Sequence, residues 1–297
     1  MENFADRLTT RTRELGHPLC VGFDPYLDKI PSQFRGATDP ETVRNFFSAF
    51  FAVASEKIAI VKPQISLFER MGIAGLEVLN ELIEMAKSRG LLTLLDAKRG
   101  DIGETARGYA DAYLSPDGFL DVDAVTVNPY MGLDAVEPFV ELAEANGKGV
   151  VVLVRNSNPG SDAFQKLDVG GKCLFEAVAE SLQEFEGRLM GSAGWSSLGV
   201  TVSARSPEDS MRVRRYLPHS LFLVLGYGAQ GGDAASAVAG LRPGVRGFEG
   251  GMVNSSRGVL YPSGAGFNSW ESSIENALTK AIQDLEKAQP QLSGQKA

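Results

Sequence analysis

The sequence predicts a (β/α)8 barrel, the TIM-barrel class of α/β folds. Its length of 297 residues suits one such barrel without a second domain. Short apolar runs recur along the chain, and segments with helix-like periodicity separate them. The runs are nearly continuous rather than alternating, which is typical of parallel strands covered on both faces. A doubly wound open sheet is the competing α/β interpretation, because it has the same alternation of strand and helix.

The predicted elements follow in chain order. The polar segment 1–16 predicts an amphipathic helix and lacks the apolar stretch of a signal peptide. Eight strands are then expected at 18–25, 57–64, 91–98, 123–130, 149–157, 197–204, 221–228 and 246–256. The last run has the least strand-like composition, since it contains several glycines and an acid. Its assignment depends partly on completing the count of eight.

Helices are expected between the strands. The segments 40–56 and 73–90 have apolar residues at helical spacing. The longest polar loop, 156–172, suits a mobile lid over a site, although a plain surface loop explains its composition equally well. We expect one barrel domain over 1–288, including the N-terminal helix, and a flexible tail over 289–297.

Composition excludes several classes of function. The net charge of −8 argues against nucleic acid or an anionic membrane as the main partner, and no apolar run is long enough to span a bilayer. Cys20 and Cys173 show no zinc-site spacing, which indicates reduced thiols and a cytoplasmic protein. Neither His17 nor His219 ends an apolar strand beside an acid or a nucleophile. Chemistry must therefore come from lysine, aspartate, arginine and backbone groups.

The stretch LLTLLDAKRGDIGET, 91–105, concentrates charge at the end of a predicted strand. In a barrel the active site lies at the C-terminal ends of the strands. Asp96 and Lys98 are two residues apart, so they share one face of the strand, and Lys62 ends the neighbouring strand. With Asp101 on the following turn, two lysines and two acids can alternate and hold one another ionised. The alternative is an ion-pair network that only closes the top of the barrel. Other polar residues at predicted strand ends are Asp24, Gln64, Asn128, Arg155, Ser157 and Ser203.

A glycine-rich stretch, GYGAQGG at 226–232, follows the seventh predicted strand and matches G-x-G-x-x-G. A dinucleotide site would need this motif after the first strand of its unit, so that interpretation is weak here. A barrel binds phosphate through the loops after strands seven and eight, where Arg257 could grip it. Glycines that serve tight turns are the alternative.

These motifs resemble a known family. DAKRGDI, 96–102, fits the D-x-K-x-x-D signature of orotidine 5'-phosphate decarboxylases, and LCVGFDP, KPQ, RNSNPGS, GYGAQGG and NSSRG resemble the longer bacterial branch, type 2. The resemblance runs from about residue 17 to 262. It implies conversion of orotidine 5'-monophosphate to UMP and CO2 in de novo pyrimidine biosynthesis. It also implies a barrel that uses no metal and no organic cofactor, and a homodimer with sites at the interface.

The resemblance implies a role for each matching residue. Lys98 matches the lysine that protonates the ring carbon, and Asp96 matches the acid near the substrate carboxylate. Asp101 matches the second acid, which reaches into the partner's site, and Lys62 completes the array and touches the ribose. The remaining matches are to substrate-binding residues: Asp24 and, from the partner side, Thr105 at the ribose, Ser157 at the pyrimidine amide edge, and Gln230 and Arg257 at the phosphate.

Three other functions compete. A magnesium-dependent barrel such as a hexulose-phosphate synthase shares the D-x-K-x-x-D element, but it would prefer an acid where this chain has Lys62. A non-catalytic sensor of a nucleotide or sugar phosphate would leave its ligand intact. A nicotinamide-dependent oxidoreductase depends on the glycine match alone.

Overall fold

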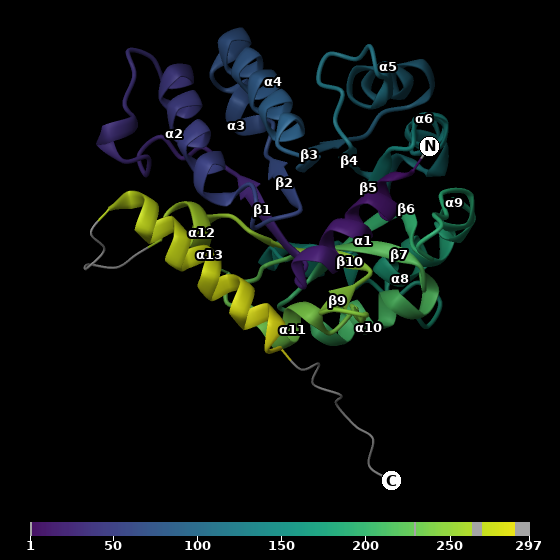
Figure 1. Cartoon of the computed structure of the whole chain (residues 1–297). Coiled ribbons are helices and arrows are strands. Elements are labelled where there is room, and N and C mark those ends of the chain that lie inside the picture. Colours follow the sequence, from purple (N-terminus) through teal and green to yellow (C-terminus); the bar gives the residue numbers. More distant parts are fainter. Residues whose placement is uncertain (1, 229, 263–268, 289–297) are drawn as a thin grey trace.

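The computed structural model describes residues 2–228, 230–262 and 269–288. Eight parallel strands close into a barrel in the order β1-β10-β7-β6-β5-β4-β3-β2, and helices surround it (Figure 1). The predicted TIM barrel is therefore confirmed, and the open-sheet interpretation is wrong. The expected tail, 289–297, lies outside the described residues.

The barrel strands lie close to their predicted positions. They are β1 (Leu19–Phe23), β2 (Ile60–Pro63), β3 (Leu92–Arg99), β4 (Ala124–Val127), β5 (Gly149–Val152), β6 (Ser196–Ser203), β7 (Ser220–Leu225) and β10 (Gly251–Ser255).

The predicted strand 246–256 is two elements. Gly250 has a φ of 84°, which a side chain would disfavour, and the chain turns there. Before the turn, β9 (Phe248–Glu249) pairs antiparallel with β8 (Arg242–Pro243) outside the barrel. Only the part after Gly250 forms the eighth barrel strand.

Helices form the outer layer. The longer ones are α1 (Phe4–Leu15), α2 (Asp39–Ala54), α4 (Gly72–Ser88), α5 (Gly103–Leu114), α6 (Glu137–Asn146), α8 (Leu174–Ser181), α10 (Pro207–Tyr216) and α13 (Trp270–Glu286). The shorter ones are α3 (Ser66–Glu69), α7 (Asp162–Gln165), α9 (Gln183–Arg188), α11 (Ala234–Val238) and α12 (Arg257–Leu260). Apolar faces of the outer helices pack against the strands in one large buried cluster.

The N-terminal helix α1 closes one end of the barrel (Figure 1). Asn3 caps it by accepting a hydrogen bond from the Asp6 N–H at 3.0 Å. Phe4 and Leu8 are almost fully buried and join a second apolar cluster with interior residues of the strands. Burial of each such side chain contributes about 1.5–3 kcal/mol, so α1 is an integral part of the barrel.

The long loop after β5 is partly ordered by its own contacts. It contains α7 and a bridge between Asp168 and Cys173. Arg155, which is 3% exposed, donates to Asp209 at 2.9 Å and to Asp162 at 2.5 Å. The sequence suggested that Arg155 faces the rim of the site, but the structure uses this side chain to anchor the loop.

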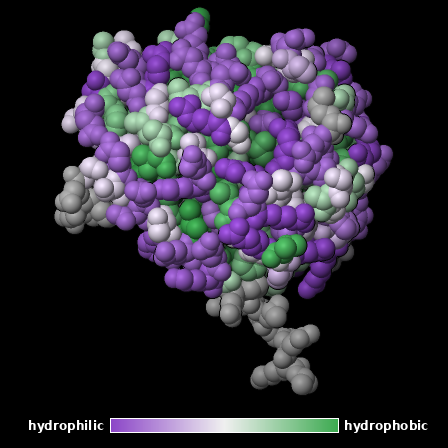
Figure 2. Space-filling view, in the orientation of Figure 1, coloured by the Kyte–Doolittle hydropathy of each residue, from purple (hydrophilic) through white to green (hydrophobic). Residues whose placement is uncertain are grey.

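One face of the molecule is predominantly polar. Figure 2 shows a mostly hydrophilic face on which hydrophobic residues occur in small scattered groups. Among the described residues no helix is both long enough and apolar enough to cross a membrane.

Candidate active site

A pocket of about 310 Å³ lies at the C-terminal ends of the barrel strands. It brings together seven of the nine predicted site residues. Its lining includes Asp24, Lys62, Asp96, Lys98, Ser157, Gln230 and Arg257, together with Tyr26, Gln64, Asn156, Asn158, Leu225, Gly226, Tyr227, Asn254 and Ser256. Residues that are far apart in the sequence meet here because parallel strands end at one rim.

Asp96 is the centre of the charged part of this pocket. The Lys62 Nζ donates to its Oδ2 at 2.8 Å, and the Lys98 Nζ donates to its Oδ1. Gln64 Nε2 donates to Oδ2 at 3.1 Å, and Thr126 Oγ1 donates to Oδ1 at 3.0 Å. Both oxygens of the carboxylate are therefore held, with one ammonium group on each.

Burial and pairing act against each other in this array. Asp96 and Lys62 are only 5% and 3% exposed. Burial alone would raise the pKa of Asp96, but the attraction of Lys62 and Lys98 outweighs it and holds that pKa well below its usual value. Burial alone would lower the pKa of Lys62, but Asp96 and Asp24 raise it. Both groups therefore stay ionised around neutral pH.

Lys98 differs from Lys62 because its side chain is 41% exposed and reaches into the open pocket. Its backbone φ is 49°, an uncommon conformation for a residue with a side chain. The β3–β4 register is also irregular between Leu95 and Arg99. Local strain of this kind clusters at functional sites, and here it sets the direction of one ammonium group.

Asp24 offers an unused acceptor at the same pocket. Its Oδ1 is buried and meets no hydrogen-bond donor among the described residues. An unsatisfied buried acceptor is costly, and a donor from a ligand would satisfy it. A hydroxyl group is a donor of this kind.

The loops after β5 and β7 and the start of α12 also line this pocket. Ser157 Oγ donates to Gln230 Oε1 at 2.8 Å, which joins the loop after β5 to the glycine-rich loop after β7. Gly226, Gly228 and Gly231 all have positive φ, so these glycines do serve tight turns. Arg257 begins α12 and lines the same pocket.

Asp101 and Thr105 are not in this pocket. Asp101 lies on the turn after β3, where its Oδ1 accepts from the Ile102 N–H at 2.9 Å. Thr105 is exposed on α5. Exposed apolar side chains lie on the same loop and after β4, with Ile102 55% and Tyr130 84% exposed. Within one chain the array is therefore Lys62, Asp96 and Lys98.

Sequence reasoning noted Gln64 without giving it a role, and it missed Thr126. The available signal was a single threonine inside the apolar run DAVTVNPY. Asn254 and Ser256 belong to NSSRG, which was recognised as a motif, but only Arg257 was assigned.

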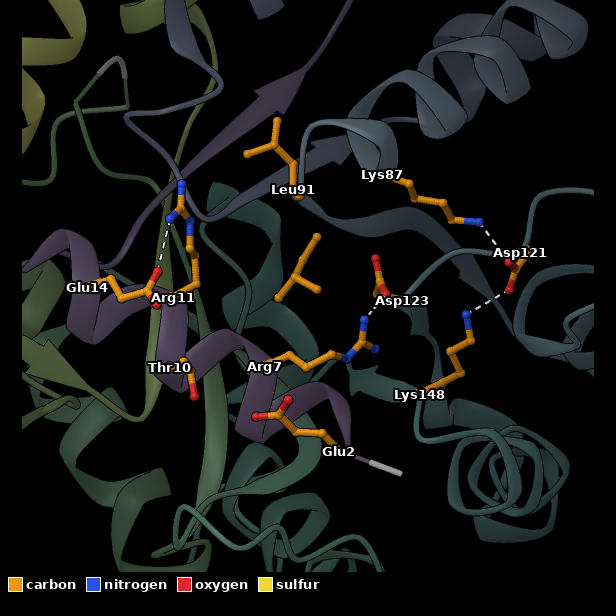
Figure 3. A pocket seen from close by; sticks show the side chains of 12 residues that line it. Glu2, Arg7, Thr10, Arg11, Glu14, Lys87, Leu91, Asp121, Asp123 and Lys148 are labelled. Carbon is orange, nitrogen blue, oxygen red and sulfur yellow. Dashed lines mark hydrogen bonds and ion pairs between the residues drawn. The ribbon is translucent and has the colours of Figure 1, made fainter.

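A second cavity, of about 550 Å³, lies at the other end of the barrel beside α1 (Figure 3). Its cations face carboxylates. Arg7 pairs with Asp123 at 2.5 Å, and Lys87 and Lys148 both pair with Asp121 at 2.7 Å. In barrels this face serves stability rather than catalysis. The smaller pocket, with an exposed lysine and an unused acceptor, is the better candidate.

The described residues contain no group of three or more histidine, cysteine, aspartate or glutamate side chains placed to hold a metal ion.

Comparisons with known proteins identify the family of the chain. The model of the orotidine 5'-phosphate decarboxylase / HUMPS family matches residues 18–262. The chain is 35% identical to an orotidine 5'-phosphate decarboxylase of Rhodopirellula baltica, over 96% of this chain and 99% of that one. It is 37% identical to the enzyme of the same name from Caldicellulosiruptor bescii, over 88% and 90% of the two chains.

The structural comparison gives the same result. The OMP decarboxylase of Leishmania donovani superposes with a TM-score of 0.77 at 31% identity, covering 95% of this chain and 97% of that one. The family match covers most of the chain, and full-length relatives exceed 30% identity. The chain therefore belongs to the orotidine 5'-phosphate decarboxylase / HUMPS family.

Proposed function

We propose that this protein decarboxylates orotidine 5'-monophosphate to UMP and CO2, the last step of de novo pyrimidine biosynthesis, in the cytoplasm. The names of its full-length relatives support this activity. The observation that carries it is the Lys98 ammonium group, held against buried Asp96 in a pocket that Ser157, Gln230 and Arg257 also line.

The chemistry follows from the charges. The bond between the ring carbon and the carboxyl carbon breaks, the electron pair stays on the ring carbon, and neutral CO2 leaves. No adjacent electron sink stabilises this carbanion, so a fixed ammonium group must do so as the charge develops. Lys98 then donates its proton to the ring carbon, which gives UMP. Asp96 keeps Lys98 charged and aimed, and it would lie near the departing carboxylate.

The rest of the pocket binds the nucleotide. Asp24 accepts from a ribose hydroxyl, which would satisfy its buried Oδ1, and Lys62 contacts the same sugar. Ser157 addresses the amide edge of the pyrimidine. Gln230 and Arg257 hold the phosphate, whose binding energy is remote from the reacting carbon and can be used for orientation.

A homodimer would complete the site. Asp101 and Thr105 lie outside the pocket of their own chain, so they are available to a partner's site. Ile102 follows Asp101 directly in the sequence, Tyr130 follows the end of β4, and both side chains are exposed in the single chain. A partner that covers them would bury apolar and aromatic surface, which is typical of stable interfaces. We propose that Asp101 extends the array in the second protomer's pocket as the fourth charge.

The family name includes a second type of barrel enzyme, and the array argues against a magnesium-dependent reaction here. Lys62 and Lys98 occupy the two oxygens of Asp96, so a divalent cation at this carboxylate would meet two ammonium groups. The same arrangement suits proton transfer, which needs no metal or organic cofactor.

The experiment is to follow the ultraviolet absorbance of orotidine 5'-monophosphate with purified protein in excess EDTA. A fall toward the spectrum of UMP supports the proposal and excludes a metal-dependent step. An unchanged spectrum with folded protein contradicts it. A parallel reaction with magnesium and sugar phosphates then tests the competing barrel chemistry, and an intact nucleotide after prolonged incubation would indicate a sensor.

A further inference from the structure

The seam between β3 and β4 is irregular where the site begins. Leu95 lies opposite Val125, but the next paired residue of β3 is Arg99, opposite Val127. Three residues of β3, 96–98, therefore face the single residue 126 of β4. A bulge of this kind redirects side chains and leaves backbone groups without their ladder partners. Asp96 and Lys98 both lie in it.

The hydroxyl of Thr126 fills this gap. It accepts from the Ala97 N–H at 2.9 Å and from the Lys98 N–H at 2.9 Å. It also donates to Asp96 Oδ1 at 3.0 Å, the oxygen that the Lys98 ammonium contacts. Thr126 is 1% exposed. Two backbone donors and one carboxylate oxygen thus meet at a single buried hydroxyl.

This geometry ties both partners of one ion pair to the same atom. The backbone of Lys98, in its left-handed conformation, is held through its N–H, and the carboxylate of Asp96 is held through its Oδ1. Any shift of the hydroxyl would change the direction of the lysine relative to the acid. Catalytic groups need to be held within about 0.5 Å of their productive geometry by buried neighbours of this type.

We propose that Thr126 is a positioning residue for the reaction, whose hydroxyl sets the β3 bulge and aims Lys98. This inference rests on the proposed decarboxylase function. Thr126 touches no substrate in this account and acts through Asp96 and Lys98. Its removal should therefore lower kcat while leaving nucleotide binding largely unchanged.

Thr93 provides a matched control in the same pair of strands. It lies near the opposite end of β3 and is fully buried. Its Oγ1 donates to Asp123 Oδ2 at 3.0 Å and accepts from the Asp123 N–H at 3.1 Å. The chemistry matches that of Thr126, since each hydroxyl serves one carboxylate and at least one backbone N–H group. Asp96, which Thr126 contacts, lines the active-site pocket, whereas Asp123, which Thr93 contacts, does not.

The test compares full-length Thr126→Val, Thr126→Ser and Thr93→Val with wild type. Valine keeps the shape and removes the hydroxyl, and serine keeps the hydroxyl. We measure kcat and KM for orotidine 5'-monophosphate, the inhibition constant of UMP, and the urea midpoint. Both valine variants should lose stability, but only Thr126→Val should lose kcat, by about 10- to 100-fold, as expected for a lost hydrogen bond to a charged group. KM and the UMP constant should stay within about 3-fold, and Thr126→Ser should restore most of kcat.

Three results would overturn the proposal: equal kcat values in the two valine variants, a joint loss of turnover and UMP binding in Thr126→Val, or a serine variant as slow as the valine variant. If Thr126→Val does not fold, Thr126→Cys replaces it, because a thiol is a weaker donor, and it must be slower than Thr126→Ser. If wild type and Thr93→Val leave the nucleotide intact, the proposed function itself fails, and this inference fails with it.

Discussion

Replacement of Asp96 by asparagine should destabilise the protein and stop its reaction. The change keeps the shape of the side chain and removes the charge that pairs with Lys62 at 2.8 Å. Lys62 is 3% exposed, so its ammonium would be left buried, with Asp24 as the remaining carboxylate of this chain that raises its pKa among the described residues. The pair with Lys98 contributes less, because that side chain is 41% exposed.

The magnitude follows from this burial. Breaking a buried ion pair by removing one partner costs about 3–5 kcal/mol. Because Asp24 still stabilises Lys62, we expect a loss near the lower limit, about 3 kcal/mol in the free energy of unfolding. Turnover should fall at least about 100-fold, since Lys98 loses the group that aims it.

The assay is urea unfolding at neutral pH, with kcat/KM measured on the same samples. Asp123→Asn is the control, because Asp123 is equally buried at 5% exposure and pairs with Arg7 at the other end of the barrel. It should lose stability and keep its activity. An Asp96→Asn protein within about 1 kcal/mol of wild type would refute the reasoning about Lys62. Equal losses of activity in both variants would refute the assignment of the site.

Three further perturbations probe other parts of the molecule. Asp101→Ala and Lys98→Ala chains, each inactive alone, are mixed in equal amounts with subunit exchange confirmed. Half of the dimers are then mixed and each has one intact site of two, so about a quarter of wild-type activity should return. No recovery would contradict a shared site. Arg257→Ala should raise KM by about 10- to 100-fold through loss of a charge-assisted phosphate contact, whereas Arg246→Ala, near α1, should not; an unchanged KM in both would remove the phosphate role. Burial lowers the pKa of His17 from 6.5 to about 4. As the pH falls, the unfolded chain therefore binds a proton at His17 before the folded protein does. The free energy of unfolding is highest above pH 6.5 and decreases as the pH falls toward 4. Between pH 8 and pH 5 this loss should reach about 2 kcal/mol, and urea midpoints of His17→Gln should show a smaller loss over that range; equal losses would contradict it.

The fold was predictable because its main determinant is local. A parallel barrel buries both faces of every strand, so each strand appears as an apolar run that can be recognised without its neighbours. The run 246–256 failed because it contains Gly250, and its positive φ depends on where the chain must turn. The expected strand over 149–157 ended at Val152, and the role of Arg155 depends on Asp209, 54 residues further on.

The candidate site was predictable to the extent that strand ends converge. Asp24, Lys62 and Asp96 line one pocket because the strands of a closed parallel barrel all end at the same rim. The contribution of Thr126 could not be read from the sequence, because a hydroxyl within an apolar strand gives no sign of the bulge opposite it. Asp101 could be placed only outside its own pocket, since its proposed site belongs to a second chain.

The most direct test of the account is the turnover of Lys98→Ala, with UMP binding measured on the same protein. Decarboxylation of orotidine 5'-monophosphate should be abolished, because Lys98 is the proposed proton donor to the ring carbon and the alanine side chain has no proton to give. UMP should still bind with nearly wild-type affinity, since Asp24, Gln230 and Arg257 are untouched. Near-normal turnover by Lys98→Ala would contradict the central claim that this ammonium group carries the reaction.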